Sequence, residues 1–299
     1  MIAAVVVFYR PDLNVAKRVL SSLAAQVDTI FAVDNTPGSS EDLSVLVAEF
    51  AGASYLPLED NKGIATAQNA GIRQSAATGH SHVLLLDQDS AVPPGMVGAL
   101  LKAETKLLRA GARVAAVGPL YVDKKTNTLS YAIRYRWFRV NKVLIDPSAI
   151  YPVESDWLIS SGSLIRTSVL EEVGPMLDEL FIDWVDAEWG MRARKLGLRS
   201  FVVPNASMDH SVGDSSGRVL GHTINFHNLT RNYYIVRNAT YLLRPREMGW
   251  RWVTVMLLKI PRHIAVHSWY SERKLRSLAV LVGAVFAGAL GRIGRTTEK

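Results

Sequence analysis

The chain has 299 residues, 48% of them hydrophobic, which suits one large α/β domain, or a catalytic domain with a helical appendage, and excludes a disordered protein. It contains no cysteine, so a disulfide framework and a thiolate metal site are both excluded, and a cytoplasmic location is expected. The net charge of +7 is concentrated in residues 222–299, which hold 13 lysines and arginines against 3 acidic residues.

The first 120 residues alternate short apolar runs with helical patterns. Uninterrupted Val and Leu runs are typical of strands buried on both faces, and repeated strand–helix–strand units build parallel sheets. The sequence therefore predicts an α/β fold with a doubly wound, mainly parallel, Rossmann-like sheet. Its strands are expected at residues 2–8, 29–33, 53–58, 82–86 and 114–117, with helices at 12–26, 41–50, 64–75 and 96–109.

The second part of the chain is less regular. Alternation at 129–139 and a further run at 153–159 indicate an irregular β region, which would build the acceptor side of a cleft. The later expected elements are helices at 168–172 and 185–196, a strand at 198–203, a polar loop at 209–217, and only helices after about residue 222. We expect a catalytic domain over 1–221, with a nucleotide-binding half at 1–120 and an acceptor half at 121–221, and a basic helical extension over 222–299.

The basic extension has the composition of a membrane-surface segment. It interleaves Trp250, Trp252 and Trp269 with arginine and leucine, a pattern that suits an anionic membrane interface. No signal peptide is expected at the N-terminus, and the apolar stretch 278–290 is too short to span a bilayer. We therefore expect a cytoplasmic protein that is peripheral at the inner face of the cell membrane. Its C-terminal helices also offer a surface for a homo-oligomer. Nucleic acid is the competing partner, but no helix-turn-helix, zinc or RNA-binding signature is present, so none is predicted.

Polar side chains follow several of the expected strands. In doubly wound sheets, ligands bind beyond the carboxyl ends of the strands, where Tyr9-Arg10, Asp34-Asn35 and Asp87-Gln88-Asp89 would lie. Two carboxylates in a turn after a buried strand are the oxygen ligands that Mg²⁺ or Mn²⁺ accepts while it also binds phosphates. Each strand end alone could be ordinary turn chemistry, since Asp and Asn are common there. Several such ends around one crevice favour a binding site.

Four motifs carry a family resemblance, at residues 5–11 (VVVFYRP), 33–35 (VDN), 60–71 (DNKGIATAQNAG) and 181–192 (FIDWVDAEWGMR). In this order they resemble the first strand with its donor-base loop, the second strand end, the N-x-G-x-A-x-A-x-N-x-G segment and the E-D-x-D segment of glycosyltransferase family 2. Within that family, the chain is similar to bacterial rhamnosyltransferases that build cell-surface polysaccharides. The resemblance implies a GT-A fold and inverting sugar transfer from a nucleotide-diphosphate donor.

The resemblance also implies which residues form the site. Asp89 would be the direct metal ligand, with Asp87 reaching the metal or the sugar, and His210 would supply a third ligand from the polar loop. Small residues such as Gly63 would let the backbone approach the nucleotide and the neighbouring strands, although a tight helix–sheet contact explains the alanines equally well. The nucleotide and substrate would be bound by Phe8, Tyr9, Arg10, Asp34, Asn61, Lys62, Gly63, Asp87 and Gln88.

The catalytic base implied by the resemblance is Asp186. The chain departs from the family pattern at Val185, where a glutamate is frequent, so Asp183 and Glu188 stay open as rival carboxylates. On a helix, Asp183 and Asp186 would share a face, and one of them would have a raised pKa. A solvated acidic edge of an amphipathic helix is the alternative. Downstream, the repeated Arg-Asn pairs at 231–232 and 237–238 indicate helix packing or a basic wall beside the diphosphate.

The hypothesis is therefore a metal-dependent inverting glycosyltransferase that moves L-rhamnose from dTDP-L-rhamnose to a lipid-linked or growing surface glycan. Thymidine and rhamnose rest on the resemblance alone, so a UDP-linked donor stays open. A nucleotidyltransferase would carry a glycine-rich basic loop after its first strand, which residues 8–12 lack. A non-catalytic membrane-surface adaptor would explain the basic extension but would leave the paired acids without a role.

Overall fold

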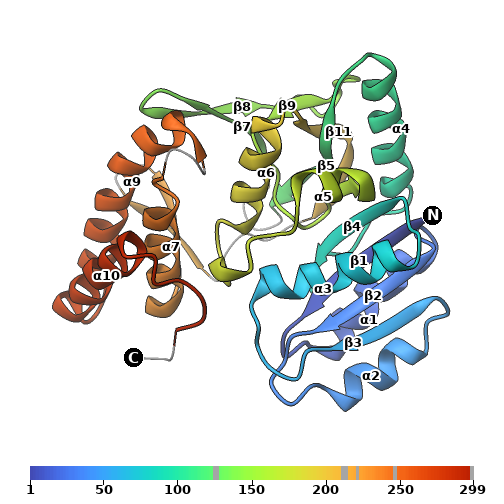
Figure 1. The fold of residues 1–299 in the computed structure, drawn as a ribbon, viewed down its shortest axis with the longest axis horizontal. Helices are drawn as coiled ribbons and strands as arrows, with labels where there is room; N and C mark the ends of the chain where they lie inside the picture. Colours follow the sequence, from blue (N-terminus) through green and yellow to red (C-terminus); the bar gives the residue numbers. More distant parts are fainter. Residues whose placement is uncertain (124–127, 210–214, 220–221, 245–247, 297–299) are drawn as a thin grey trace.

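The computed structural model describes residues 1–123, 128–209, 215–219, 222–244 and 248–296. Its centre is a nine-stranded sheet (Figure 1). The strand order is β3 (Ala53–Pro57), β2 (Thr29–Asp34), β1 (Ile2–Phe8), β4 (His82–Asp87), β10 (Leu164–Arg166), β5 (Val114–Asp123), β11 (Arg199–Asp209) and β9 (Val153–Ser155), with β6 (Thr128–Leu129) paired to β5. The pairs among β1 to β4 and between β5 and β11 are parallel, whereas β6, β9 and β10 run antiparallel to their neighbours. The predicted mainly parallel sheet is confirmed.

Helices cover both faces of this sheet. They are α1 (Leu13–Ala24), α2 (Glu41–Ala48), α3 (Ile64–Ala77), α4 (Met96–Arg109), α5 (Thr167–Val173), α6 (Val185–Lys195) and the short 3₁₀ helix η1 (Asp178–Leu180). Alternate residues of β1 face two separate buried clusters: Ala3 and Val5 pack with α3, α5 and α6, whereas Ala4 and Val6 pack with α1, α2 and α4. Burial on both faces is why the strand is apolar at every position.

Over the first 120 residues the observed elements lie close to the expected ones, and Asp12 caps α1 by accepting hydrogen bonds from the backbone N–H groups of Asn14 and Val15. The second part differs more. The alternation at 129–139 belongs to a hairpin of β7 (Tyr131–Arg136) and β8 (Arg139–Leu144) rather than to one strand. Strand β10 has no expected counterpart, because three residues are too few to give a periodic signal.

In the C-terminal part, the described residues form a hairpin and three long helices. These elements are β12 (Ser215–Val219), β13 (His222–Phe226), α7 (Leu229–Tyr241), α9 (Trp250–Trp269) and α10 (Lys274–Ala289). The expectation of helices alone after residue 222 is therefore wrong at β13, which pairs with β12. Figure 1 shows the three helices grouped at the end of the molecule away from β3 and α2. Among the described residues, no helix combines the length and the hydropathy that a bilayer span requires.

The three helices pack tightly against each other and against the sheet domain. At Gly288 of α10, an added Cβ would lie 2.3 Å from the carbonyl oxygen of Arg237 in α7, so only glycine permits this approach. Trp252 is fully buried and meets the ring of Trp184 edge-on at 5.0 Å, which removes it from the expected membrane-facing tryptophans. Trp250 and Trp269 are exposed. After α10 the chain returns to the sheet domain, where Arg295 pairs with Asp60 at 2.7 Å.

Candidate active site

The loops that follow β1, β2 and β4 are joined by hydrogen bonds at the carboxyl edge of the sheet. The backbone N–H of Tyr9 donates to Oε1 of Gln88 at 2.8 Å, and the N–H of Arg10 donates to Oγ1 of Thr36 at 2.8 Å. Phe8 is buried in the core, whereas Tyr9 and Arg10 are exposed, with the Arg10 guanidinium 5.5 Å from the centre of the Tyr9 ring. The structure thus brings these four predicted donor-site residues together.

Asp34 lies in the same group of loops, but its carboxylate is turned inward. The side chain is fully buried and accepts hydrogen bonds from the backbone N–H groups of Thr36 and Ser40, at 2.9 and 2.7 Å, and from the Tyr55 hydroxyl at 2.7 Å. Both carboxylate oxygens therefore hold the loop after β2 in place. A direct contact between Asp34 and a nucleotide stays a prediction.

The segment before α3 is attached to the end of β2 through two asparagines. Oδ1 of Asn61 accepts from the side-chain amide of Asn35 and from the N–H of Gly63, both at 3.1 Å, and the N–H of Lys62 donates to Oδ1 of Asn35 at 2.8 Å. The ammonium of Lys62 lies 3.8 Å from Asp60 and is half exposed. Asn35 was not among the predicted site residues, and this bridging role explains why an asparagine stands there.

Gly63 lies at a close approach between the two halves of the chain. Its φ is +86°, and an added Cβ would lie 2.5 Å from the carbonyl oxygen of Phe181. That oxygen also accepts a hydrogen bond from the N–H of Ile64 at 2.7 Å. Further along α3, Asn69 bonds both the N–H and the carbonyl of Met176, at 2.9 and 2.8 Å. The spaced small and polar residues of this motif thus join the first half to the segment before α6, and an approach to nucleotide stays a prediction.

Asp87, Gln88 and Asp89 occupy the end of β4 and the turn after it. The N–H of Asp87 donates to Oγ of Ser161 at 3.0 Å, which fixes the half-buried end of the strand. Asp89 is exposed, and its Oδ1 lies 3.4 Å from Oγ of Ser90. The triplet therefore offers one exposed carboxylate and one at the edge of the interior, both beside the donor-side loops.

The loop before α6 has an unusual backbone. Phe181, Asp183 and Trp184 have left-handed conformations, with φ of 65°, 63° and 67°. Strain of this kind persists only where surrounding contacts impose it. The contacts come from Asn238 of α7, whose side-chain amide donates to the carbonyls of Leu180 and Ile182 at 2.8 Å each. Since α6 begins at Val185, Asp183 lies outside the helix, and the expectation that Asp183 and Asp186 share a helical face is wrong.

The three rival carboxylates have different partners. Asp183 forms an ion pair with Arg231 of α7 at 3.2 Å. Glu188 is buried and bound by Arg192 through two hydrogen bonds, at 2.8 and 2.9 Å. This burial also removes the alternative of a solvated acidic edge. Asp186 has no arginine or lysine partner among the ion pairs of the described residues, and Oδ1 accepts from the N–H of Ala187 at 2.8 Å.

Asp186 has a pKa well above that of a free aspartate. Burial is the largest cause, and it raises the pKa of Asp186 to about 7. Hydrogen bonds from the backbone of Ala187 and Ser160 lower this pKa, while repulsion from Asp87 and Asp183 raises it further. A carboxyl group with a pKa near neutrality can accept a proton at physiological pH and remain a useful base. Asp186 is therefore the one of the three rival carboxylates that has a pKa raised to about 7 and no arginine partner among the described ion pairs, and its role as the base stays a prediction.

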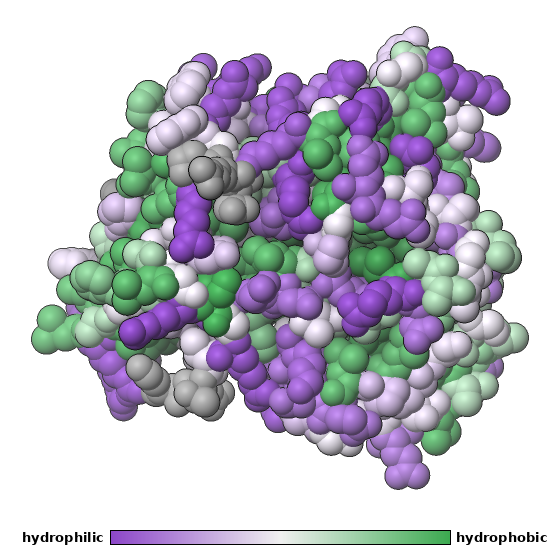
Figure 2. All heavy atoms as spheres, viewed as in Figure 1, coloured by the Kyte–Doolittle hydropathy of each residue, from purple (hydrophilic) through white to green (hydrophobic). Residues whose placement is uncertain are grey.

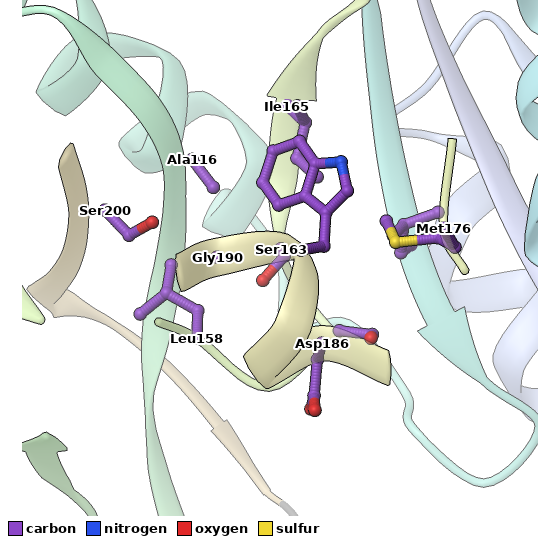
Figure 3. Close-up of a pocket in the computed structure, with 11 residues that line it drawn as sticks. Ala116, Leu158, Ser163, Ile165, Met176, Asp186, Gly190 and Ser200 are labelled. Carbon is purple, nitrogen blue, oxygen red and sulfur yellow. The ribbon is translucent and has the colours of Figure 1, made fainter. Parts of the chain in front are cut away.

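Behind Asp186 the interior is closed. A cavity of about 20 Å³ lies beside it, lined by Ser160, Ser163, Ser200 and Trp189 among others, and has room for about one water molecule. Figure 3 shows Asp186 at one edge of this lining, on the first turn of α6, with Ile165 at the opposite edge. A sugar does not fit in this cavity.

A divalent cation fits the chemistry of this edge. Asp87 and Asp89 supply oxygen donors, and the repulsion between Asp87 and Asp186 is of the kind that a cation relieves. His210 lies outside the described residues, so its place as a third ligand stays a prediction. Within the part of the chain that the structure describes, no group of three or more His, Asp or Glu side chains could hold a metal by itself.

Comparison with known proteins decides the family. A family model described as Glycosyl transferase family 2 matches residues 3–174. The chain belongs to glycosyltransferase family 2. It is 32% identical to the dTDP-rhamnosyl transferase RfbF of Shigella flexneri over 83% of this chain and 81% of that protein. It is 26% identical to the N-acetylglucosaminyl-diphospho-decaprenol L-rhamnosyltransferase of Mycobacterium tuberculosis, over 95% and 98% of the two chains.

Solved structures confirm the GT-A fold of this family 2 glycosyltransferase. The crystal structure of GalNAc-T7 with UDP, GalNAc and Mn²⁺ aligns with a TM-score of 0.60 at 16% identity, covering 89% of this chain and 55% of that one. The structure of S. aureus TarS 1-349 aligns with a TM-score of 0.58 at 14% identity, covering 98% and 82%. The doubly wound fold with a C-terminal helical extension, expected from the sequence, is thereby confirmed.

Several residues of this glycosyltransferase matter to the site without having been predicted for it. Tyr121 is buried and donates to the carbonyl of Ser161, and it lies close enough to Asp87 and Asp186 for their charges to raise its pKa, after burial. Nothing in its local pattern marks it. Asn238 carries a signal, the repeated Arg-Asn pair, and its complete burial shows that helix packing is the correct interpretation there.

Proposed function

We propose that this glycosyltransferase transfers L-rhamnose from dTDP-L-rhamnose, with inversion, to a lipid-linked or growing surface glycan. The donor is inferred from the 32% identical relative that is named a dTDP-rhamnosyl transferase, and the lipid-linked acceptor from the relative named for a diphospho-decaprenol substrate. The observation that carries the inverting mechanism is the state of Asp186. Its pKa is raised to about 7, while its rivals Asp183 and Glu188 are paired with arginines.

In this mechanism Asp186 takes the proton of the acceptor hydroxyl as that oxygen attacks the anomeric carbon. The bond from that carbon to the nucleotide diphosphate breaks on the opposite face, so one displacement inverts the configuration and no covalent intermediate forms. A positioned general base contributes about 10²–10⁴-fold to such a step. Asp34 and the loop of Tyr9 and Arg10 that follows the buried Phe8 would hold the base and ribose, beside Asn61, Lys62 and Gly63.

The proposed cofactor is Mg²⁺ or Mn²⁺, held by Asp89 and Asp87 with His210 as a further ligand. When bound, the cation would neutralise charge that develops on the leaving diphosphate. Gln88, which accepts a hydrogen bond from the backbone of Tyr9, would keep this turn aligned with the donor-base loop. The acidic residues would thus have two roles. Asp87 and Asp89 would hold the metal at the leaving diphosphate, and Asp186 would take the proton of the acceptor.

The function is tested with a panel of nucleotide sugars. Purified protein with Mg²⁺ or Mn²⁺ is expected to bind and slowly hydrolyse dTDP-L-rhamnose in preference to UDP-linked sugars, as measured by calorimetry and by release of dTDP. If a UDP-linked sugar bound more tightly, the donor would be that sugar and not dTDP-L-rhamnose. Absence of binding to every nucleotide sugar would overturn the proposed reaction.

Metal dependence gives a second prediction. Asp89→Ala is expected to lower dTDP release on the order of 100-fold, because a Lewis acid contributes several kcal/mol to charge stabilisation, and EDTA should have a similar effect on the unaltered protein. Asp42→Ala, which removes an exposed carboxylate from α2, is the matched control and should retain activity. Full activity of Asp89→Ala in the presence of EDTA would remove the metal from the mechanism.

The pH dependence follows from the direction of the Asp186 shift. Below its pKa of about 7 the carboxyl is protonated and cannot accept a proton, so kcat/KM is expected to fall about tenfold per pH unit on the acid side and to level off above pH 7. A cation bound at Asp87 would weaken the repulsion on Asp186 and move this limb to lower pH. Measuring kcat/KM from pH 5 to 9 checks this prediction. If the fall on the acid side is unchanged in Asp186→Asn, it belongs to the titration of another group.

We also propose that residues 1–221 form a catalytic domain and that residues 222–299 form a basic helical extension. The extension would lie on the inner face of the cell membrane. Exposed side chains of the last two helices support it: Trp250, Leu257, Leu258, Trp269, Leu275 and Phe286. Apolar side chains interleaved with lysine and arginine suit an anionic bilayer surface. The same helices would offer the contact for any homo-oligomer.

A further inference from the structure

A pocket of about 320 Å³ lies between α7 and α9, next to the candidate active site. Its apolar wall includes Met256 and Ile260 of α9 and Trp184. Trp184 is two residues before Asp186, and its indole N–H donates to the carbonyl of Ile235 in α7 at 2.9 Å. The residue that forms this part of the pocket wall thus belongs to the loop that leads into Asp186.

The pocket carries positive charge without a matching carboxylate. Lys259 and Arg262 line it on α9, and no ion pair among the described residues involves either. Both residues are exposed, although partial loss of hydration, followed by repulsion from Lys142 and Arg262, lowers the pKa of Lys259. Two positive charges that line one open cleft raise the local concentration of anions, so this pocket favours an anionic ligand.

Two histidines add neutral polar groups to the same pocket. His263 and His267 line the pocket with ring centres 4.0 Å apart, and Nε2 of His263 lies 3.0 Å from Oδ1 of Asn232 in α7. Burial, then the neighbouring charges of His267 and His227, lowers the pKa of His263 to about 3, so this ring is a neutral hydrogen-bonding group. His227 also acts electrostatically on Asp183, and so links the pocket to the loop before α6.

An apolar groove continues from the pocket on the other flank of α9. It has a volume of about 470 Å³ and is lined by Leu243 just after α7, Leu257 and Ile264 of α9, and Val285 of α10. Ile260 lines both spaces and makes them neighbours. Figure 2 shows hydrophobic side chains gathered over this helical end of the molecule, with hydrophilic ones beside them. A charged pocket that adjoins an apolar groove matches an amphiphile.

We propose that the α7–α9 pocket binds the phosphate or diphosphate of a lipid-linked acceptor, and that the lipid chain lies in the adjoining groove. Lys259 and Arg262 would neutralise the head group, with the histidines as hydrogen-bond partners. Trp184 would then present the attached sugar to Asp186. The inference rests on the proposed function, which it deepens by assigning the acceptor its own site, separate from the donor loops at the sheet edge.

Farnesyl diphosphate, which has a diphosphate and a short apolar chain, tests the proposal in titrations with the full chain and Mg²⁺. We expect Lys259→Gln combined with Arg262→Gln to weaken its binding about tenfold or more, since hydrogen bonds to charged groups are the strong ones. Leu257→Gln should weaken the binding of farnesyl diphosphate but leave the binding of pyrophosphate unchanged. The matched control Arg251→Gln removes an exposed charge from the same helix outside the pocket and should have no effect.

Binding of dTDP, measured on the same samples, separates this proposal from the proposed function. We expect dTDP to bind all variants equally and not to compete with farnesyl diphosphate. If dTDP displaces it fully, the amphiphile occupies the donor site and the pocket proposal is overturned. The proposal is also overturned if the double variant binds farnesyl diphosphate as tightly as the unaltered protein does. It is overturned as well if the double variant loses binding to phosphatidylglycerol vesicles to the same extent as to farnesyl diphosphate, because the pocket would then be a general contact with the bilayer. Binding of farnesyl diphosphate without any nucleotide binding would keep the pocket and reject the transferase reaction.

Discussion

Replacing Asp186 with Asn is expected to slow transfer by about 10²–10⁴-fold and, at pH 8, to raise the melting temperature. Activity falls because the amide cannot take the acceptor proton. Stability rises because the folded protein disfavours the charged form of Asp186. Burial and repulsion from Asp87 raise the pKa of this carboxyl to about 7. An amide of the same shape keeps the hydrogen bond from Ala187 and removes the charge. Active sites commonly exchange stability for activity in this way.

The effect of pH on this gain has a definite sign. The pKa of Asp186 is raised from 3.8 in a free aspartate to about 7 in the folded chain. Between these values the unfolded chain releases the proton and the folded chain keeps it, so the wild-type protein loses stability as pH rises. The advantage of Asp186→Asn should therefore be largest above pH 7, about 4 kcal/mol or on the order of 8 °C, and should vanish near pH 4.

Thermal unfolding of both proteins from pH 4 to 9, together with dTDP release, measures the two effects. Glu188→Gln is the matched variant on the same helix: it leaves Arg192 without its buried carboxylate, so it should lower the melting temperature while most activity remains. If Glu188→Gln abolished transfer and Asp186→Asn did not, the base would be Glu188. If Asp186→Asn lowered the melting temperature at pH 8, its carboxylate would be a stabilising group rather than a destabilised one.

The sequence predicts well those features that depend on neighbouring residues. The strand at Ile2–Phe8 and the helix at Met96–Arg109 have the expected bounds, since continuous apolar runs and helical periodicity are local patterns. The ion pair of Glu188 with Arg192 is also local, since residues four apart meet on a helix. That spacing alone would have weakened Glu188 as a candidate base.

The remaining features depend on contacts between distant residues, which no local pattern contains. The left-handed backbone at Asp183 and Trp184 is imposed by Asn238 and by packing against α3, more than 50 residues away in each case. Asp34 stands at a strand end as predicted, but only Tyr55, from the next strand, shows that its carboxylate points inward. The environment that raises the pKa of Asp186 likewise requires β4 and α6 to be placed together.

Replacing Gly63 with Ala is expected to lower both stability and transfer, because this residue sets the distance between the donor half and the loop that positions Asp186. Two penalties act at once. With φ +86° and ψ 162° the backbone lies in a region that is essentially restricted to glycine, which costs any other residue about 1–3 kcal/mol. The new methyl group would also lie 2.5 Å from the Phe181 carbonyl oxygen, a backbone atom that cannot rotate away. Moving the backbone costs about 1–3 kcal/mol more.

Gly79 separates these two penalties, since it has a similar φ of +74° but no atom within 4 Å of an added Cβ. Gly79→Ala should therefore lose only the conformational part of the free energy of unfolding, measured with urea, and retain full activity. Gly63→Ala should lose more stability and also kcat, because a displaced Phe181 moves the strained residues that lead into α6. Equal stability of the two variants would mean that the loop before α6 yields freely, and that Asp186 is positioned by α7 alone.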